Sequence, residues 1–241
     1  MRAGNSRSTV NARLMNGWNT AGGSRGRWVD PSGVPMTAAT VLCSTKGRAA
    51  LGSSFGRYLE GTPAEELART LGGAGLAYAL IGGQAVNCWA VPRITEDFDF
   101  VVLANRDAII EVEAALRALE FEYDRRDDAG EPSGPDFVRM VSPQTGVIVD
   151  LQTAKTDFQE AVVHRAATSV SGTRVATAED LVVMKLIAGR SKDNDDIRRL
   201  LEFVPALDLD YVRTWARIWD VEARLDGALR WLADDRPGPP P

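Results

Sequence analysis

Two aspartates separated by one phenylalanine constrain this chain more than any other feature. In residues 95–103, Asp97 and Asp99 alternate with Phe98 and Phe100, which is the period of a β-strand with one acidic and one apolar face. Two carboxylates on one face repel each other, and a strand that buries phenylalanines on its back tolerates them only with a counter-charge. We expect a divalent cation to supply it. The alternative is a solvent-facing strand of a one-sided sheet, in which the aspartates carry no chemistry.

A third carboxylate, Asp150, lies near the end of an apolar run, residues 146–151. A neighbouring position in the sheet would bring it beside the pair, where it could ligate metal or take the proton of an acceptor. Magnesium prefers carboxylate oxygens together with substrate phosphates, and two such ions can clamp the attacking and leaving oxygens of an in-line phosphoryl displacement. We therefore expect Asp97 and Asp99 to hold Mg²⁺ or Mn²⁺, with Asp150 either as a further metal ligand or as the proton acceptor.

Two glycines, Gly82 and Gly83, stand between a short apolar run, residues 76–81, and a predicted helix, residues 84–90. Unshielded N–H groups at the start of such a helix can cradle a phosphate. A plain tight turn is the more frequent meaning of two glycines. The aspartate pair at the start of the next strand makes the phosphate cradle the more specific interpretation.

Lys185 interrupts the apolar run of residues 181–188 in another predicted helix. An unpaired ammonium on a buried face is costly, so something anionic must meet it. Its partner is either a bound triphosphate or a carboxylate, Asp193 or Asp196, in a structural ion pair.

The order of the predicted elements indicates an α/β (α+β) fold, a mixed sheet with helices packed on it. The strands are predicted at 76–81, 95–103, 120–123, 137–141 and 146–151, and the helices that accompany them at 62–71, 84–90 and 106–118. Residues 137–151 should form a hairpin, and a smaller one is expected near Ser171. We predict a loosely attached tail at 1–56, a catalytic core at 57–170 and a helical C-terminal module at 171–235. Asp195 and Arg199 in that module have the spacing of a helix ion pair.

Charge and composition exclude several classes of protein. Residues 1–57 carry eight Lys or Arg against one acid, and the chain as a whole is −5, so residues 58–241 carry −12. That balance argues against a broad nucleic-acid-binding face on the folded part. One histidine, His164, and two cysteines, Cys43 and Cys88, offer neither a Cys/His metal site nor a disulfide framework. No apolar run is long enough to span a bilayer, so we expect a cytoplasmic protein without a membrane partner.

The motifs match the pattern of a known family. They are Gly82-Gly83, a short helix, Arg93-x-Thr95-x-Asp97-x-Asp99 and then Asp150, followed by the run from Lys185 to Arg190 and by Lys192-Asp193-x-x-Asp196-Ile197. The first part resembles the polymerase-beta-like nucleotidyltransferase superfamily. The second part looks like the second and third motifs of the AbiEii-type toxin nucleotidyltransferases. Together the motifs cover about residues 62–200.

This resemblance implies a mixed-sheet nucleotidyltransferase core with a helical module, two magnesium ions held by Asp97 and Asp99, and a nucleoside triphosphate as donor. Lys185 would then touch the phosphates. The other residues that it assigns to the nucleotide site or to its support are Gly82, Gly83, Arg93, Thr95, Arg190, Lys192, Asp193 and Asp196. One departure concerns Gly83, because many members have serine there, with a hydroxyl that contacts a terminal phosphate.

The resemblance also implies an activity. We expect an enzyme that moves a nucleoside monophosphate from the triphosphate onto a hydroxyl, as the toxin component of a toxin–antitoxin pair. Its acceptor would be tRNA or another RNA, and a cognate antitoxin would be its protein partner. Related folds modify antibiotics such as lincosamides and aminoglycosides, so a resistance enzyme is the first alternative. The second is a non-catalytic nucleotide-binding module, which the presence of all three carboxylates disfavours.

Overall fold

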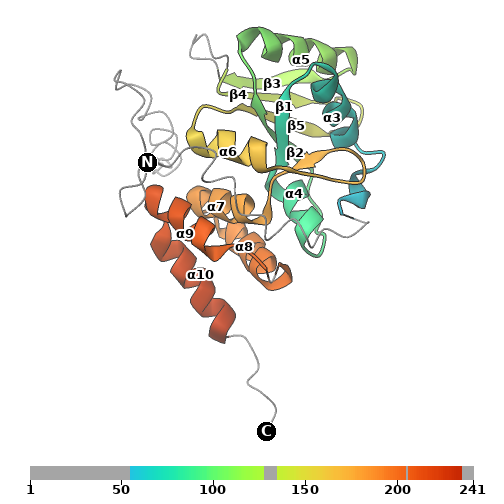
Figure 1. Ribbon diagram of the computed structural model, residues 1–241. Helices are drawn as coiled ribbons and strands as arrows, with labels where there is room; N and C mark the ends of the chain where they lie inside the picture. The colour runs from blue at the N-terminus through green and yellow to red at the C-terminus, as the bar shows by residue number, and fades with distance from the viewer. Residues whose placement is uncertain (1–54, 128–134, 205, 235–241) are drawn as a thin grey trace, which may run out of the picture. The chain divides into compact units, whose positions relative to one another are not determined.

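A computed structural model describes residues 55–127, 135–204 and 206–234 (Figure 1), all of which fall within one compact unit. Its helices are Pro63–Gly73 (α3), Gly82–Trp89 (α4), Arg106–Ala118 (α5), Asp157–Arg165 (α6), Ala178–Ala188 (α7), Ser191–Phe203 (α8), Leu209–Ile218 (α9) and Glu222–Asp234 (α10), after a short 3-10 turn, Arg57–Leu59 (η2). Its strands are Ala77–Ile81 (β1), Asp97–Leu103 (β2), Glu122–Asp127 (β3), Phe137–Val141 (β4), Ile148–Thr153 (β5), Ala167–Thr168 (β6) and Arg174–Val175 (β7).

The seven described strands form one mixed sheet in the order β3-β4-β5-β2-β1-β7-β6. Strands β2 and β5 run parallel, as do β1 and β7, and the remaining neighbours are antiparallel. The predicted hairpin of β4 and β5 is present, and the small hairpin near Ser171 joins β6 to β7 at the sheet edge. The predicted α/β (α+β) class is thereby confirmed.

Alternation along β2 decides which face of the sheet is buried. Phe98 and Phe100 are 7% and 0% exposed, whereas Asp97 and Asp99 on the other face are only half-buried. The next helix, α5, spans the predicted residues, and the Asn105 side chain caps it by accepting a hydrogen bond from the Ala108 N–H. Strand β2 and its back-side phenylalanines therefore present both aspartates at one surface.

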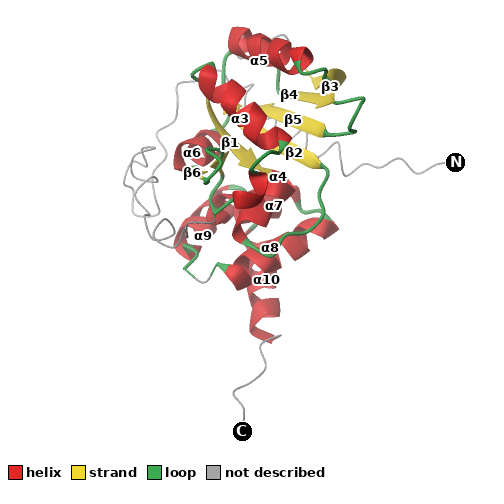
Figure 2. Ribbon diagram, turned by 90° about the vertical axis from the view of Figure 1, so that its right-hand side faces the viewer, coloured by secondary structure: helices red, strands yellow, loops and turns green. Residues whose placement is uncertain are grey.

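Helices α7 to α10 gather at one end of the sheet, and α4 lies between them and the strands (Figure 1, Figure 2). Contacts of α4 with both α7 and α8 hold this arrangement. The Thr177 hydroxyl caps α7 by accepting a hydrogen bond from the Asp180 N–H. Gly189 ends α7 in the left-handed conformation (φ 60°), where a Cβ would lie 2.4 Å from the guanidinium of Arg224 on α10.

Some predicted details were wrong. Phe55 and Gly56 do not belong to a loose tail, because the Phe55 ring packs against Trp89 at 4.8 Å. Residues 1–54 of that tail lie outside the described part of the chain. The boundary at 171 divides the β6–β7 hairpin, whose second strand pairs with β1.

The predicted ion pair between Asp195 and Arg199 was also wrong. Arg199 binds Asp196 at 3.0 Å, and Asp195 lies 3.6 Å from Arg198, so both pairs have three-residue spacing. Asp196 faces inward from α8 while Asp195 is exposed, and the inward carboxylate attracts the arginine. In the described ranges, no helix is both long and apolar enough to cross a membrane.

Candidate functional site

The three acidic residues predicted from the sequence come together on two parallel strands. Asp99 on β2 is directly opposite Asp150 on β5, and Asp97 precedes Asp99 by two residues on the same face. The pKa of Asp99 is raised to about 6, chiefly by burial and then by the charges of Asp150 and Asp97, while Lys185 and Arg190 act to lower it. Asp99 is therefore a carboxylate that lacks sufficient positive charge around it.

Asp150 already has a cationic partner. The Arg139 guanidinium donates two hydrogen bonds to its carboxylate, 2.7 and 2.6 Å long, from the neighbouring position of β4. The Asp150 side chain is 5% exposed and that of Arg139 is 34% exposed. The pairing raises the pKa of Arg139, so the guanidinium remains protonated. Sequence reasoning missed Arg139, because its place opposite Asp150 depends on the register of β4 against β5.

These contacts decide how well the acidic residues suit a divalent cation. Among the residues that the structure describes, no group of three His, Cys, Asp or Glu side chains forms a ready metal-ligand set. Asp97 and Asp99 fit a cation, because they are half-exposed and the pKa of Asp99 is raised partly by uncompensated negative charge. Asp150 fits only if it leaves Arg139, since both of its oxygens are engaged.

Both glycines of the turn before α4 are required by close packing. Gly82 has φ 68°, and a Cβ there would lie 1.9 Å from Oδ2 of Asp99. A Cβ at Gly83 would lie 2.8 Å from the Thr95 hydroxyl and 3.3 Å from the Arg93 guanidinium. The N-terminus of α4 thus lies against Asp99, and the Thr95 hydroxyl occupies the space beside position 83.

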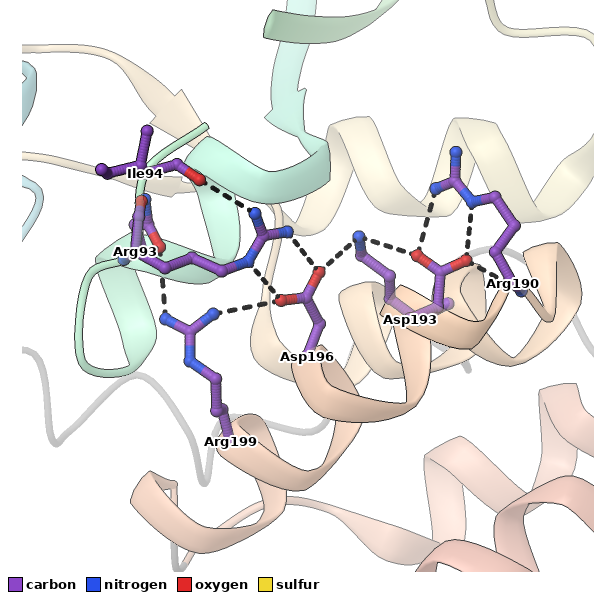
Figure 3. A network of polar contacts seen from close by, with 8 residues as sticks. Arg93, Ile94, Arg190, Asp193, Asp196 and Arg199 are labelled. Atoms are coloured by element: carbon purple, nitrogen blue, oxygen red, sulfur yellow. Dashed lines mark hydrogen bonds and ion pairs between the residues drawn. The ribbon is translucent and has the colours of Figure 1, made fainter. Parts of the chain in front are cut away.

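A network of charges runs along the first turns of α8, from Arg93 and Arg199 at one end to Arg190 at the other (Figure 3). Asp193 and Asp196 are both fully buried, and they bind the cationic side chains around them. Asp196 accepts hydrogen bonds from Arg93 (2.9 and 2.9 Å), Lys185 (2.8 Å) and Arg199 (3.0 Å). Asp193 accepts bonds from Lys185 (3.1 Å) and from the Arg190 side chain (2.7 and 3.1 Å). Four cations therefore share two carboxylates, which leaves two positive charges in surplus.

The pKa values of the two buried aspartates reflect this surplus. Burial alone would raise the pKa of Asp196, but hydrogen bonds from Arg93 and Lys185 outweigh it and lower the pKa to about 2. Burial likewise opposes the ionisation of Asp193, whose pKa is nevertheless lowered by Arg190 and Lys185. Both groups are thus anions at neutral pH and hold the cations in place.

Lys185 forms the structural ion pair with Asp193 and Asp196 that was the alternative to a bound triphosphate. It is 5% exposed and its ammonium bonds to both Asp193 and Asp196. A contact between Lys185 and phosphate stays a prediction. The side chains of Arg190 and Arg93 are more accessible, at 58% and 37% exposed.

The remaining predicted residues, Lys192 and Thr95, are both accessible to solvent. Lys192 is exposed in the first turn of α8, and Thr95 is partly exposed before β2. Sequence reasoning missed Gln84, Asn87 and Arg199, whose side chains bind the loop that carries Thr95. Amides inside a short helix give no periodic signal, and only their burial in the fold reveals them.

A family described as "Nucleotidyl transferase of unknown function" (DUF2204) matches residues 62–222, from the cap of α3 to the first residue of α10. The chain belongs to this family. The prediction of a nucleotidyltransferase enzyme is thereby confirmed, and the narrower resemblance to AbiEii-type toxins stays a prediction. A comparison with curated proteins found no match.

Solved structures similar to this nucleotidyltransferase include an antigenic nucleotidyltransferase-like protein from Paracoccidioides brasiliensis, with 17% identity over 74% of this chain and 93% of that one (TM-score 0.41). JHP933 from Helicobacter pylori has 16% identity over 69% and 79% (TM-score 0.41). ANT(2")-Ia in complex with adenylyl-2"-tobramycin has 14% identity over 67% and 99% (TM-score 0.45). At these TM-scores the likenesses carry no inference about substrates.

Proposed function

We propose that this nucleotidyltransferase moves a nucleoside monophosphate from a nucleoside triphosphate onto an acceptor hydroxyl and depends on a divalent metal ion. One observation carries the proposal. The backbone of Gly82, at the N-terminus of α4, touches the carboxylate of Asp99. A helix N-terminus favours phosphate, and a carboxylate pair favours a cation. Here the two lie in contact, as a metal-bound triphosphate requires.

Asp97 and Asp99 would hold the metal, with Mg²⁺ or Mn²⁺ as the ion. When bound, such an ion neutralises charge on the transferring phosphate and on the leaving group. The N–H groups of Gly82 and Gly83 would bind the phosphates, and the Thr95 hydroxyl, which lies beside position 83, would replace the donor that a serine there provides.

The surplus positive charge of the α8 network serves the rest of the triphosphate. Arg190 and Arg93 are the accessible members, so we assign them to the phosphates, with Lys192 beside them. Asp196 holds Arg93 and Asp193 holds Arg190, and Lys185 binds both carboxylates. Arginine suits this role because its planar fork can bind phosphate oxygens in pairs.

In the reaction, the acceptor oxygen forms a bond to the α-phosphorus as the bond to the pyrophosphate oxygen breaks. Asp150 lies beside Asp99 on the same face and takes the acceptor's proton in our proposal. To do so it must loosen its two bonds to Arg139. Pyrophosphate leaves along the side of Arg190, where the exposed cation neutralises it.

We further propose an RNA acceptor such as tRNA and a role as the toxin of a toxin–antitoxin pair, neutralised by a cognate antitoxin protein. The exposed Arg190 and Lys192 support an anionic acceptor, because they stand at the site itself while residues 58–241 carry a net charge of −12. An RNA would therefore be held locally, at its reacting end.

The test uses purified protein, α-labelled nucleoside triphosphates, Mg²⁺ or Mn²⁺, and total RNA. Label should enter RNA with the wild type and not with Asp99→Asn, and chelation should abolish incorporation. Aminoglycosides and lincosamides are tested in parallel. Label on a drug but not on RNA would replace the toxin role by a resistance enzyme, and label on neither, with intact nucleotide binding, would indicate a non-catalytic module.

A further inference from the structure

The loop between α4 and β2, residues 90–96, connects the phosphate-facing helix to the acidic strand. It carries Arg93 and Thr95 and leads directly into Asp97. Apolar burial does not hold its apex, because Val91 is 56% and Ile94 is 93% exposed. Polar contacts must therefore fix the shape of this α4–β2 loop.

Two buried amides of α4 bind the backbone of the loop. The Asn87 side chain donates to the Arg93 carbonyl (2.8 Å) and accepts from the Arg93 N–H (3.0 Å). The Gln84 side chain donates to the Thr95 carbonyl (3.1 Å). No described strand pairs with the loop at these positions, so the side-chain amides form the hydrogen bonds that its backbone groups would otherwise make within a sheet.

Helix α8 holds the loop from the other side through Arg199 (Figure 3). Its guanidinium donates to the Val91 carbonyl, to Oδ1 of Asn87 (3.2 Å) and to Oδ1 of Asp196 (3.0 Å). Arg199 therefore joins α8, α4 and the loop, and its side chain is 18% exposed. Asp196 in turn binds the side chain of Arg93.

We propose that Arg199 is a positioning residue, which locks the α4–β2 loop so that Arg93 and Thr95 meet the donor phosphates in a single geometry. This inference rests on the proposed function. Arg199 itself faces the loop backbone and the buried aspartate, so it acts through Arg93. It couples the helical end of the molecule to the catalytic strand.

Removing Arg199 should release the loop without unfolding the protein. Asp196 would keep Arg93 and Lys185 as partners, and Asn87 would keep both bonds to the backbone of Arg93. The buried carboxylate would thus remain paired. The Val91 end of the loop would lose the hydrogen bond that its carbonyl accepts from Arg199.

Trypsin provides a direct measure, because its cleavage of the bond from Arg93 to Ile94 requires Arg93 to leave Asp196 and the loop to open. Cleavage of a transiently opened segment follows the population of the open form. Arg199→Met should speed the appearance of the new N-terminus at Ile94 about tenfold, as loss of roughly one charged hydrogen bond implies. Its melting temperature should remain within a few degrees of the wild type.

Arg198→Met is the matched control, since Arg198 lies next to Arg199 on α8 but contacts Asp195 and the Trp231 ring instead of the loop. It should leave cleavage at Arg93 and transfer unchanged. Arg199→Met should raise KM for the triphosphate several-fold more than it lowers kcat, and Arg199→Lys should restore part of the loss.

The outcomes separate the two proposals. Equal cleavage rates at Arg93 in the wild type and Arg199→Met, or equal KM values, would overturn the role of Arg199 while the transfer reaction stands. Absence of transfer by the wild type with any acceptor would overturn the proposed function. Loss of folding in Arg199→Met, with Arg199→Lys folded and as protected as the wild type, would also overturn a purely positioning role.

Discussion

Replacing Asp99 by asparagine should stabilise the free protein while removing its activity. Burial and the charges of Asp150 and Asp97 raise the pKa of Asp99 from 3.8 to about 6. A shift of that size corresponds to about 3 kcal/mol of unfavourable interaction in the folded state. Because Asp99 is only partly buried, solvent screening reduces this figure, and we expect the variant to gain about 1–2 kcal/mol.

The gain should depend on pH in a defined direction. Above about pH 6, Asp99 is ionised in the folded protein and the repulsion is at full strength. Below about pH 4, it is protonated in both the folded and the unfolded states, so the wild type and the variant should be equally stable. The wild type therefore loses stability as pH rises from 4 through 6 and the Asp99 carboxyl ionises. The Asp99→Asn variant has no group that ionises there, so its stability does not fall for this reason.

The assay is thermal unfolding of the wild type and Asp99→Asn at pH 4 to 8, with chelator and with Mg²⁺. At pH 8 with chelator the variant should melt about 3–6 °C higher, since 1 kcal/mol shifts a domain of this size by roughly 2–4 °C. Mg²⁺ should raise the melting temperature of the wild type only. Asp195→Asn is the matched control, because its side chain is 74% exposed, and it should change nothing.

A melting temperature for Asp99→Asn equal to or below that of the wild type at pH 8, with the control unchanged, would refute this reasoning. It would mean that the neighbouring carboxylates do not destabilise Asp99, and the chief ground for placing a cation there would be lost. Full transfer activity in Asp99→Asn or Asp97→Asn would independently refute the metal role of the pair.

Three further substitutions test other parts of the site. Arg139→Met leaves the buried Asp150 unpaired, so unfolding should become about 2–4 kcal/mol easier in chelator, and Mg²⁺ should recover part of this in a melting curve. Lys185 is buried against two aspartates, so Lys185→Met should destabilise the fold by roughly 3 kcal/mol. In calorimetric titration it should change nucleotide affinity less than Arg190→Met does. Gly82→Ala should abolish metal-dependent nucleotide binding in the same titration, since its Cβ would overlap the Asp99 carboxylate; undiminished binding would exclude contact between the α4 turn and the site.

The sequence predicted the parts of the site that follow from strand period. Alternation in residues 95–103 placed Asp97 and Asp99 on one face, and the apolar run before Asp150 placed the third carboxylate on a neighbouring strand. It could not show that Asp150 has a partner, because that depends on the register of β4 against β5. A hairpin register shifted by one residue would have turned Arg139 to the opposite face.

Lys185 shows a second limit of sequence reasoning. The apolar run around it predicted a buried ammonium that needs an anion, and the structure supplies two. The choice between carboxylate and phosphate could not be made from spacing, because it depends on how α8 packs against α7. Once α8 turns Asp193 inward, the lysine is neutralised within the protein. The more exposed Arg190 then becomes the better candidate for the phosphates.

The helical end of the molecule is consequently part of the site and not an appendage to it. Asp193 and Asp196 are buried on α8, yet they determine where Arg93 and Arg190 lie relative to the acidic pair on β2. Two carboxylates that hold four cations create a positive surplus next to a pair of aspartates that lack positive charge. A bound cation would neutralise the aspartate pair, and a bound polyphosphate would neutralise the surplus positive charge on α8. A metal-free nucleotide, or a metal without nucleotide, neutralises only one of the two, so each ligand should strengthen the binding of the other.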